Sequence, residues 1–585
     1  MYSNKENVNI LTALLVKADI RHAVVCPGSR NAPIVHNLNE CPDITCYPVT
    51  DERSAGFYAL GMALCTCRPV AVCVTSGTAL LNLAPAVAEA YYQHVPLVVI
   101  SADRPPQWID QLDGQTLPQS DALGRFVRKS VTLPEISFLP EGGVSEGQSA
   151  GDELHWYCHR LVSEALMECT NRGGGPVHIN VPLTEPLFQF DVEDLANEDG
   201  ISRWCGTIYG WEIERSGLLA DFWAAKRPMI VIGQNRETVL KDHELEHLKK
   251  HAVLLYEPLG SDLGTTHFDE VLYAHGEDEG LLPDFVLYGG MIVSKRLKQF
   301  LRKATEAEFW ELSLDGELHD TFKRTKGVME CGFRTMLLWL DDYLGNPTLI
   351  KEYNEDAEEP LGALPETSEY VDRWQQELNR VAAASEAYNP SYSQMAAMRS
   401  FEQQFSESDL TVNMFYANSS AVRLACIYET GYVYCNRGVN GIDGSLSTAA
   451  GFSCVADNLV FCVIGDLSFF YDQNALWNQN LRGNFRILLM NNGKGGIFNL
   501  LKGLEQSPAR DKYVAAEHHT SAAGICQQNN VVYIKAENME EMQEGIGRLL
   551  QKESDRPILL EVFTDAAEDE RVFRDYYSAI KNIKR

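Results

Sequence analysis

Short apolar runs rich in β-branched residues recur along the chain, and longer stretches with helical spacing of apolar residues separate them. This alternation is typical of parallel sheets that are covered by helices on both faces. In the first third of the chain, the pattern predicts strands at 23–26, 70–75, 97–101 and 177–181. Between those strands it predicts helices at 54–64 and 79–93.

Two further blocks repeat the pattern. The second has predicted strands at 229–232, 253–256 and 285–288, and the third at 412–417, 433–436, 459–464, 487–490, 531–535 and 558–563. Residues 351–369 are rich in acidic residues and proline, which indicates a linker. We therefore predict an α/β fold with three doubly wound parallel-sheet domains: N-terminal at 1–190, central at 200–350, a linker at 351–388, and C-terminal at 389–585.

The chain is strongly acidic, with 50 Lys and Arg against 81 Asp and Glu and a net charge of −31. Such a surface repels nucleic acid and anionic membranes, so neither is an expected partner. No apolar run approaches the ~18 residues that span a bilayer, and the N-terminus lacks a secretory pattern. The 15 cysteines have no metal-site or redox spacing, which favours reduced thiols in a cytoplasmic protein. His518 and His519 are expected at the surface, because no partner cluster accompanies them.

Two predicted strands of the third block end in residues that suit a metal ion. The strand at 459–464 leads to Asp466 and the strand at 487–490 leads to Asn492 and Gly493, with Asp466 and Asn492 26 positions apart. Open parallel sheets bind ligands at the carboxyl ends of their strands. Mg²⁺ prefers hard oxygen ligands, here the Asp466 carboxylate, the Asn492 side-chain carbonyl and the main-chain carbonyl of Lys494. Alternatively, both motifs are ordinary turns with a helix cap.

Gly-Asp followed by Asn-Asn at this separation resembles the cofactor motif of thiamine-diphosphate-dependent enzymes. The resemblance implies thiamine diphosphate as cofactor, with Mg²⁺ as its metal and Mn²⁺ as the alternative ion. These enzymes need a carboxylic side chain that hydrogen-bonds N1′ of the aminopyrimidine and so promotes loss of the thiazolium C2 proton. Glu52, followed by Ala55, Gly56 and an apolar helix, resembles that activating glutamate; the alternative is an acidic residue that favours a helix N-terminus. In the superfamily the glutamate and the metal come from different subunits, which implies a homodimer or a dimer of dimers with active sites at the subunit interface.

Longer motifs narrow the resemblance. They are CPGSRNAP at 26–33, TSGTA at 75–79, SADRPP at 101–106, NRG at 436–438, GIDG at 441–444 and GDLSF at 465–469. They resemble the 2-succinyl-5-enolpyruvyl-6-hydroxy-3-cyclohexene-1-carboxylate synthase (MenD) family of menaquinone (vitamin K2) biosynthesis. The match is strong in the outer blocks and weaker in the central one.

This resemblance implies a transferase that decarboxylates 2-oxoglutarate on thiamine diphosphate and adds the succinyl-semialdehyde carbanion to isochorismate. The N-terminal domain would then bind the pyrimidine of the cofactor and the C-terminal domain its diphosphate. Both substrates carry at least two negative charges, and the planar fork of arginine suits carboxylates. By resemblance, the substrate-binding residues are Ser29, Arg30, Arg104, Gln115, Lys295, Arg423 and Arg437.

By the same resemblance, Glu52 is the catalytic residue and also binds the cofactor. The other cofactor-binding residues are Ser419, Ile442 (an apolar wedge that bends the cofactor), Asp466, Asn492, Ile497 and Phe498, and the metal ligands are Asp466, Asn492 and the Lys494 main-chain carbonyl.

Two positions depart from the family pattern. Gly114 replaces the usual asparagine before Gln115, and Lys494 replaces the first of three usual glycines. Two alternatives therefore stay open: an acetohydroxyacid-synthase-like thiamine enzyme that acts on pyruvate, or a non-catalytic relative. The first would not need Arg30 or Arg104, and the second would have lost Glu52 or the metal motif.

Overall fold

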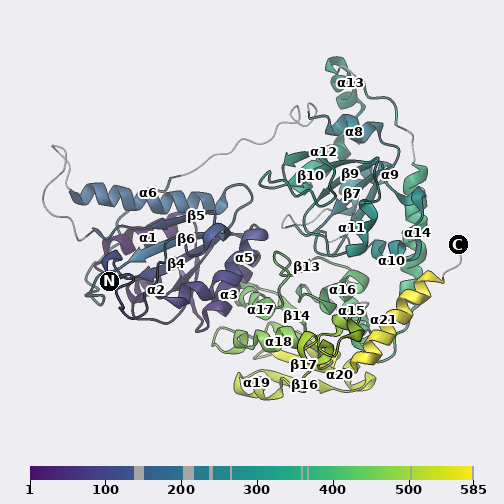
Figure 1. The fold of residues 1–585 in the computed structure, drawn as a ribbon. Coiled ribbons are helices and arrows are strands. Elements are labelled where there is room, and N and C mark those ends of the chain that lie inside the picture. The colour runs from purple at the N-terminus through teal and green to yellow at the C-terminus, as the bar shows by residue number, and fades with distance from the viewer. Residues whose placement is uncertain are drawn as a thin grey trace.

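The computed structural model describes residues 1–136, 150–201, 216–235, 241–261, 263, 266–357, 360–364, 368–500 and 503–582. Within these residues, the strands form three sheets of six, five and six strands. All neighbouring strands in the sheets are parallel. The sheets follow one another along the chain and helices flank each of them (Figure 1). The predicted α/β class with three parallel-sheet domains is confirmed, whereas the domain limits stay a prediction.

The N-terminal sheet has the strand order β2-β1-β3-β4-β6-β5. Its strands are β1 (His22–Val25), β2 (Thr45–Pro48), β3 (Val70–Val74), β4 (Leu97–Asp103), β5 (Lys129–Thr132) and β6 (Val177–Pro182). Its helices are α1 (Glu6–Lys17), α2 (Ala32–Glu40), α3 (Glu52–Thr66), α4 (Thr78–Asn82), α5 (Ala84–Tyr92) and α6 (Ala150–Thr170), with 3-10 turns η1 (Pro106–Trp108) and η2 (Gly124–Phe126).

Both faces of this sheet are buried. Successive residues of a strand point to opposite faces, so Val72 of β3 lies in one core with α3 and α5, while Ala71 and Cys73 lie in another with α1, α2 and α6. This double cover explains why the strands are almost continuously apolar. The helix predicted at 79–93 is in fact two helices, because Pro85 near the start of α5 cannot donate a backbone hydrogen bond to the preceding turn.

The central sheet has the strand order β11-β10-β9-β7-β8. Its strands are β7 (Pro228–Ile232), β8 (Val253–Tyr256), β9 (Phe285–Gly289), β10 (Glu308–Ser313) and β11 (Thr325–Glu330). Its helices are α8 (Leu218–Ala224), α9 (Leu248–His251), α10 (Phe268–His275), α11 (Lys295–Leu301), α12 (Phe333–Gly345) and α13 (Pro347–Asp356), with 3-10 turns η4 (Asp242–Leu245) and η5 (Glu279–Leu281).

The C-terminal sheet has the strand order β13-β12-β14-β15-β17-β16. Its strands are β12 (Val412–Tyr416), β13 (Val433–Tyr434), β14 (Leu459–Gly465), β15 (Phe485–Asn491), β16 (Val532–Ala536) and β17 (Ile558–Phe563). Its helices are α15 (Gln394–Ser406), α16 (Ser420–Tyr428), α17 (Ser445–Val455), α18 (Asp466–Tyr471), α19 (Ala523–Gln528), α20 (Met539–Leu549) and α21 (Ala566–Lys581). Short turns of 3-10 or π-helix are η6 (Gln473–Leu476), η7 (Gly496–Leu500), η8 (Leu504–Gln506) and η9 (Arg510–Val514).

The predicted linker contains a long helix, α14 (Glu369–Ala387), which lies along the central and C-terminal domains (Figure 1). Its buried Trp374 donates a hydrogen bond to the Leu281 carbonyl of the central domain (3.1 Å), and Ser385 bonds to Tyr576 of α21 (3.0 Å). The segment therefore packs against both domains. Residues 358–359 and 365–367 of the predicted linker lie outside the described residues.

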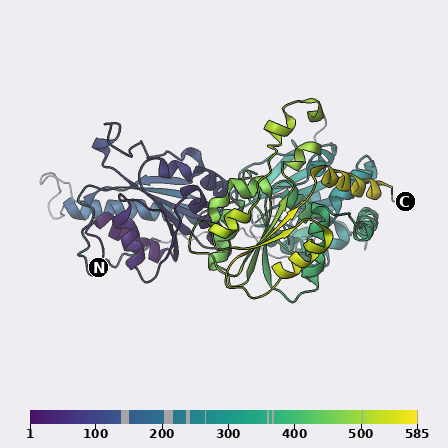
Figure 2. The ribbon, with the colours of Figure 1, turned by 90° about the horizontal axis from the view of Figure 1, so that it is seen from below.

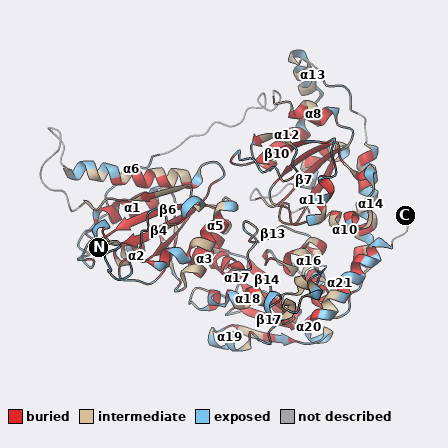
Figure 3. Cartoon of the chain, in the orientation of Figure 1, coloured by how far each residue is buried: buried red, intermediate tan, exposed pale blue. Residues whose placement is uncertain are grey.

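The N-terminal and C-terminal domains meet where α3 packs against α17 (Figures 1 and 2). The two helices approach so closely that a Cβ added at Gly61 would lie 1.9 Å from the Thr448 carbonyl oxygen. At Gly451 it would lie 2.2 Å from the Tyr58 carbonyl oxygen. Because α3 begins with Glu52, this contact fixes the start of α3 relative to the C-terminal sheet. The buried strands and the exposed outer helix faces are visible in Figure 3.

Candidate cofactor and substrate site

The carboxyl ends of β14 and β15 bring Asp466 close to the turn after β15. These strands are neighbours, with Gly465 paired with Met490. Asp466 is 4% exposed; its Oδ1 accepts a hydrogen bond from its neighbour Leu467 N (2.6 Å), and its Oδ2 accepts one from Gly493 N (2.8 Å). The two strand-end motifs therefore meet at one point, held by a backbone amide.

Asn492 is oriented by a second carboxylate. Its Nδ2 donates to Asp569 of α21 (2.9 Å), and its Oδ1 accepts a long hydrogen bond from Lys494 N (3.4 Å). Gly493 takes the left-handed conformation (φ +75°), which is unstrained only for glycine, so the turn does not require a glycine at Lys494 as well. Among the described residues, no group of three or more His, Cys, Asp and Glu side chains could hold a metal. One carboxylate with amide and main-chain carbonyls instead fits a hard ion shared with phosphate oxygens.

His518 departs from its predicted surface position. Its Nε2 lies 3.4 Å from Asp466 Oδ2, and this contact raises the pKa of His518. The imidazole also packs edge-on against Phe470 of α18. His519 is exposed, as predicted. The sequence pattern missed the contact because 52 residues separate His518 from Asp466 and no local periodicity links them.

The other predicted cofactor-binding residues lie around this edge of the C-terminal sheet. Ser419 (φ +75°) directly precedes α16, and Ile442, 43% exposed, lies in the loop before α17. Ile497 and Phe498 belong to η7, where the Phe498 ring packs on Gly495 so closely that a Cβ there would meet it at 2.9 Å. A small cavity joins Asn492, Ile497 and Arg423.

Two of the predicted substrate cations, Lys295 and Arg423, line a neighbouring cavity of about 300 Å³, and Arg437 is not among its described lining residues. The lining also contains Arg296 and the side chains of Glu257, Asp269 and Glu270. Burial lowers the pKa of Arg423, and the nearby Arg437 cation lowers it further. Arg437 donates to Asn418 Oδ1 (3.1 Å). Lys295 and Arg423 can bind carboxylates, although three acidic side chains line the same cavity.

At the carboxyl edge of the N-terminal sheet, Arg30 and Arg104 lie together. Arg30 donates to the Leu183 carbonyl (2.9 Å) and to Glu185 (3.1 Å), while Arg104 pairs with Asp113 (3.1 Å) and lies 3.9 Å from the same Glu185 carboxylate. Burial and the neighbouring Arg104 cation lower the pKa of Arg30. The Glu185 side chain is 70% exposed, so it is an exchangeable partner for both arginines.

Three more predicted residues lie at the surface of this edge. Ser29 is exposed in the loop after β1, and Gln115 is exposed with φ +54°. Glu52 begins α3, is half-buried, and accepts a hydrogen bond from Asn82 (3.2 Å). The structure of the single chain thus groups Asp466 with the Asn492 turn, Lys295 with Arg423, and Arg30 with Arg104. Glu52 has no hydrogen bond to these groups among the described residues, whereas its neighbours Asp51 and Arg53 bond to Asn474 (2.7 Å) and to the Tyr471 carbonyl (2.7 Å) of the C-terminal domain.

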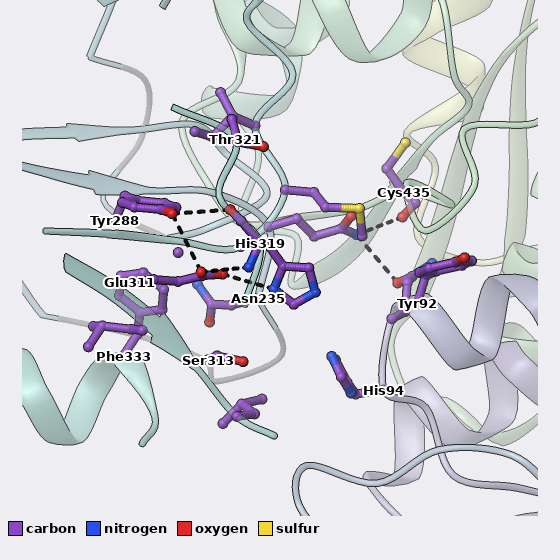
Figure 4. Close-up of a pocket in the computed structure, with 18 of the residues that line it drawn as sticks. Tyr92, His94, Asn235, Tyr288, Glu311, Ser313, His319, Thr321, Phe333 and Cys435 are labelled. Carbon is purple, nitrogen blue, oxygen red and sulfur yellow. Dashed lines mark hydrogen bonds and ion pairs between the residues drawn. The ribbon is translucent and has the colours of Figure 1, made fainter. Parts of the chain in front are cut away.

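A different cavity, of about 270 Å³, lies at the carboxyl edge of the central sheet, where all three domains meet (Figure 4). There Glu311 of β10 accepts hydrogen bonds from His319 Nδ1 (2.9 Å) and from the Tyr288 hydroxyl (3.4 Å). In the described chain, none of the predicted site residues lines this cavity. Its polar cluster was not predicted, because Glu311 interrupts an apolar run and so hides the strand that carries it.

Sequence reasoning also missed two buried glutamates that bind backbone amides next to predicted cations. Glu257, after β8, accepts from Val293 N (2.7 Å) and Ser294 N (2.8 Å), directly before Lys295. Burial raises the pKa of Glu257 to about 7. Glu89 of α5 makes the corresponding pair of contacts after Arg437. A single glutamate in an apolar segment gives no sequence signal for such a role.

Comparison with known proteins agrees with this geometry. Residues 6–123 match the family described as thiamine pyrophosphate enzyme, N-terminal TPP binding domain, and residues 418–562 match its C-terminal TPP binding domain. The fold and site are therefore those of a thiamine-diphosphate-dependent enzyme, which has thiamine diphosphate as its cofactor. In the described part of the chain, no helix is both long and apolar enough to cross a membrane.

The full-length relatives define the particular family. The chain is 44% identical to the 2-succinyl-5-enolpyruvyl-6-hydroxy-3-cyclohexene-1-carboxylate synthase of Bacteroides thetaiotaomicron, over 99% of this chain and 100% of that protein. It is 43% identical to the enzyme of the same name from Bacteroides fragilis, over 100% of both chains, and 34% identical to that of Christiangramia forsetii, over 99% and 100%. The chain belongs to the 2-succinyl-5-enolpyruvyl-6-hydroxy-3-cyclohexene-1-carboxylate synthase family.

Proposed function

We propose that this protein decarboxylates 2-oxoglutarate and transfers the remaining four-carbon fragment to isochorismate, the synthase step of menaquinone biosynthesis. The carrying observation is that the turn carrying Asn492 is bonded to the buried Asp466 through the Gly493 amide, and that Asn492 lines a small cavity with Arg423. Arg423 also lines the neighbouring cavity, together with Lys295. A site for a metal-bound diphosphate beside a site for a dicarboxylate is what this reaction requires. The cytoplasmic location stays a prediction.

The C-terminal domain would hold the cofactor. Asp466, Asn492 and the Lys494 main-chain carbonyl offer oxygen ligands to Mg²⁺, with Mn²⁺ as the alternative. Ser419, Ile442, Ile497 and Phe498 would line the cofactor pocket, with Ile442 as an apolar wedge. When bound, thiamine diphosphate supplies a nucleophilic carbon and accepts the electron pair that decarboxylation leaves behind.

The cations would bind and orient the two substrates. Arg423 and Lys295 would neutralise carboxylates of 2-oxoglutarate in the cavity between the central and C-terminal domains, and Arg437, whose charge acts on Arg423, would bind a carboxylate beside it. Ser29, Arg30, Arg104 and Gln115 would hold isochorismate, whose carboxylates take the place of Glu185 on the two arginines. Each charge-assisted bond of this kind contributes about 1.5–3 kcal/mol.

Glu52 would hydrogen-bond the aminopyrimidine N1′ and exchange a proton with it. We propose that it does so in the site of a second copy of the chain. In support, Glu52 lies at the surface of the single chain, and the apolar side chains around α18 are unusually exposed: Ile442 (43%), Tyr471 (53%) and Trp477 (58%). An exposed apolar patch of this kind indicates a surface that another protein covers, here a homodimer or a dimer of dimers.

Mixing two inactive variants tests the shared site. Glu52→Gln and Asp466→Ala are each expected to be inactive, but a mixed dimer contains one site with both native residues. After subunit exchange, activity should return to about a quarter of the wild-type value, because half of the dimers are mixed and each has one intact site. No recovery, with exchange verified by mass spectrometry, would show that both residues serve the same chain.

The reaction itself is tested with purified protein, thiamine diphosphate, Mg²⁺ and 2-oxoglutarate. We expect release of carbon dioxide, and formation of the coupled product only when isochorismate is present. A parallel reaction with pyruvate tests the acetohydroxyacid-synthase-like alternative. Turnover of pyruvate without turnover of 2-oxoglutarate would favour that alternative, and no turnover of either would favour a non-catalytic relative.

A further inference from the structure

Glu89 of the N-terminal domain reaches into a backbone segment of the C-terminal domain. Its side chain is buried, at 3% exposure, near the end of α5. Oε1 accepts a hydrogen bond from Gly438 N (2.6 Å) and Oε2 accepts one from Val439 N (2.7 Å). One carboxylate thus binds two consecutive amides that are about 350 residues away in sequence.

The fit between helix and segment is tight. A Cβ added at Gly438 would lie 2.7 Å from the Glu89 main-chain oxygen and 3.0 Å from its Oε1. Only glycine therefore allows the segment to approach α5 this closely. The carboxylate and the glycine are two halves of one contact.

This segment carries Arg437, which directly precedes the two bound amides. On its other side the segment is held by Asn418, whose Nδ2 donates to the carbonyls of Asn436 (2.5 Å) and Gly441 (2.6 Å) and whose Oδ1 accepts from Arg437 (3.1 Å). Asn418 thus binds the carbonyls of Asn436 and Gly441 and the guanidinium of Arg437. Glu89 fixes the amides, so the backbone around Arg437 is held on both sides.

The contact also includes the central domain. Gln93, one turn after Glu89, donates to Glu89 Oε1 (2.5 Å), and its own Oε1 accepts from Gln234 Nε2 (3.4 Å). Gln234 Nε2 donates as well to the Cys435 carbonyl (2.7 Å), at the cavity of Figure 4. All three domains therefore bind residues 435–439.

We infer that Glu89 is a positioning residue that sets the backbone of residues 437–439 and thereby places the Arg437 guanidinium for 2-oxoglutarate. The inference rests on the proposed function, in which Arg437 binds a carboxylate of that substrate. Glu89 itself does not touch the substrate. A charged acceptor is suited to this task, because two amides that converge on one carboxylate are bound more strongly than by neutral acceptors.

Burial raises the pKa of Glu89, while the hydrogen bonds from Val439, Gln93 and Gly438 lower it. Glu89→Gln keeps the size of the side chain but turns an NH₂ donor toward a backbone amide, which also donates. One of the two amides then loses its acceptor in a buried place, and the segment is expected to move away from α5.

The test compares wild type, Glu89→Gln and the control Glu402→Gln. Glu402 is a buried glutamate of α15 that accepts a hydrogen bond from the Tyr416 hydroxyl (2.8 Å) within the C-terminal domain, and among the described residues it makes no hydrogen bond to residues 435–439. Amide hydrogen exchange of the holoenzyme should accelerate about tenfold or more at Gly438 and Val439 in Glu89→Gln, and should stay at the wild-type rate there in Glu402→Gln. This readout does not depend on which substrate the enzyme uses.

Kinetics then link the segment to Arg437. In Glu89→Gln the KM for 2-oxoglutarate should rise about tenfold, while the KM for isochorismate changes less. In an Arg437→Ala background, Glu89→Gln should add little to that KM, because a positioning residue has no effect once its target is removed.

Each outcome is decisive for one proposal. Unchanged exchange at Gly438 and Val439, or additive effects of the two substitutions on KM, would overturn the role of Glu89. A wild-type enzyme that binds but does not decarboxylate 2-oxoglutarate would instead overturn the proposed function. In that case, the role of Glu89 is tested by amide hydrogen exchange at Gly438 and Val439 and by the calorimetric affinity for 2-oxoglutarate, which takes the place of KM.

Discussion

At the carboxyl edge of the C-terminal sheet, Asp466 is buried and bonded to the Gly493 amide, and Asn492 is fixed by Asp569. At the same edge of the N-terminal sheet, Arg30 and Arg104 bind Glu185, an exposed side chain, and Glu52 is bonded only to Asn82 among the described residues. The polar contacts of the first edge lie within the C-terminal domain. The second edge holds its arginines in ion pairs with carboxylates that are partly or largely exposed.

The difference has a simple physical origin. A metal and a diphosphate need ligands that are already in place, because reorganising buried charges on binding costs affinity. Under the proposed function, anionic substrates need cations that can change partners. Glu185 contacts both arginines and offsets the repulsion between them when no substrate is bound. Because the Glu185 carboxylate is 70% exposed and screened by water, its replacement by another anion costs little, even though the Arg30 guanidinium is buried.

The largest expected effect is at the N-terminal edge. Glu52→Gln keeps the shape of the side chain but cannot exchange a proton with the aminopyrimidine. We expect kcat for carbon dioxide release to fall by about 10²–10⁴, with thiamine diphosphate still bound. Near-normal turnover would show that the activating group lies elsewhere and that the N-terminal edge only binds substrate.

At the C-terminal edge, Asp466→Ala removes the one carboxylate of the predicted metal site. Substitution of a residue that hydrogen-bonds to a metal ligand typically lowers metal affinity by about 10–100-fold. Loss of the ligand itself should therefore lower it by about 100-fold or more. Calorimetry should show that the affinities for Mg²⁺ and for thiamine diphosphate fall together. Removal of Mg²⁺ from the wild type with a chelator should likewise lower the affinity for thiamine diphosphate. Unchanged cofactor affinity would mean that this edge is structural.

The exchangeable arginines should give a smaller and more selective effect. Arg104→Ala should reduce kcat/KM for isochorismate by about 10–100-fold, equivalent to the 1.5–3 kcal/mol of a charge-assisted bond, and should leave cofactor affinity unchanged. Arg68→Ala is the matched control, because Arg68 pairs with Asp19 on the surface of the same domain. If Arg104→Ala reduced only kcat/KM for 2-oxoglutarate, Arg104 would belong to the 2-oxoglutarate site and not to the isochorismate site.

The smallest expected effect is on the pH dependence of folding stability, which depends on buried titratable groups beneath the two sheet edges. His178 of β6 is fully buried between Ser101 and Ser130, and burial lowers its pKa to about 4. A depressed folded-state pKa means that stability is present above the unfolded value of 6.5 and is lost as pH falls toward about 4. At pH 5 the loss should be about 2 kcal/mol.

Urea unfolding of the N-terminal domain at pH 7 and pH 5 measures this loss, and His178→Gln should lack that part of the pH dependence. In the C-terminal domain, burial raises the pKa of Asp472 to about 7, so its contribution changes with pH in the opposite direction. Equal pH dependence of His178→Gln and wild type would show that folding does not lower the pKa of His178.

The fold was largely predictable, and the four strands that were missed have one of two causes. β2, β5 and β11 are edge strands with partly exposed or polar positions, so they lack a continuous apolar run. β10 lies inside the central sheet but contains Glu311, whose charge is compensated by His319, a residue outside the strand. The alternation of apolar and polar residues within a strand does not show that a charged residue has a partner outside the strand.

The amino-acid sequence by itself determined which strand ends carry the candidate site residues. Apolar runs that alternate with helical stretches predict the parallel sheets, and such sheets bind ligands at the carboxyl ends of their strands. Asp466, Asn492, Arg30 and Arg104 could be placed on those edges from local pattern and family resemblance. Only the tertiary structure decided that Glu89 binds the segment after Arg437, that His518 contacts Asp466 and that Glu185 pairs with two arginines. These contacts join residues far apart in the chain, and their energy depends on burial and geometry that exist only after the domains have packed.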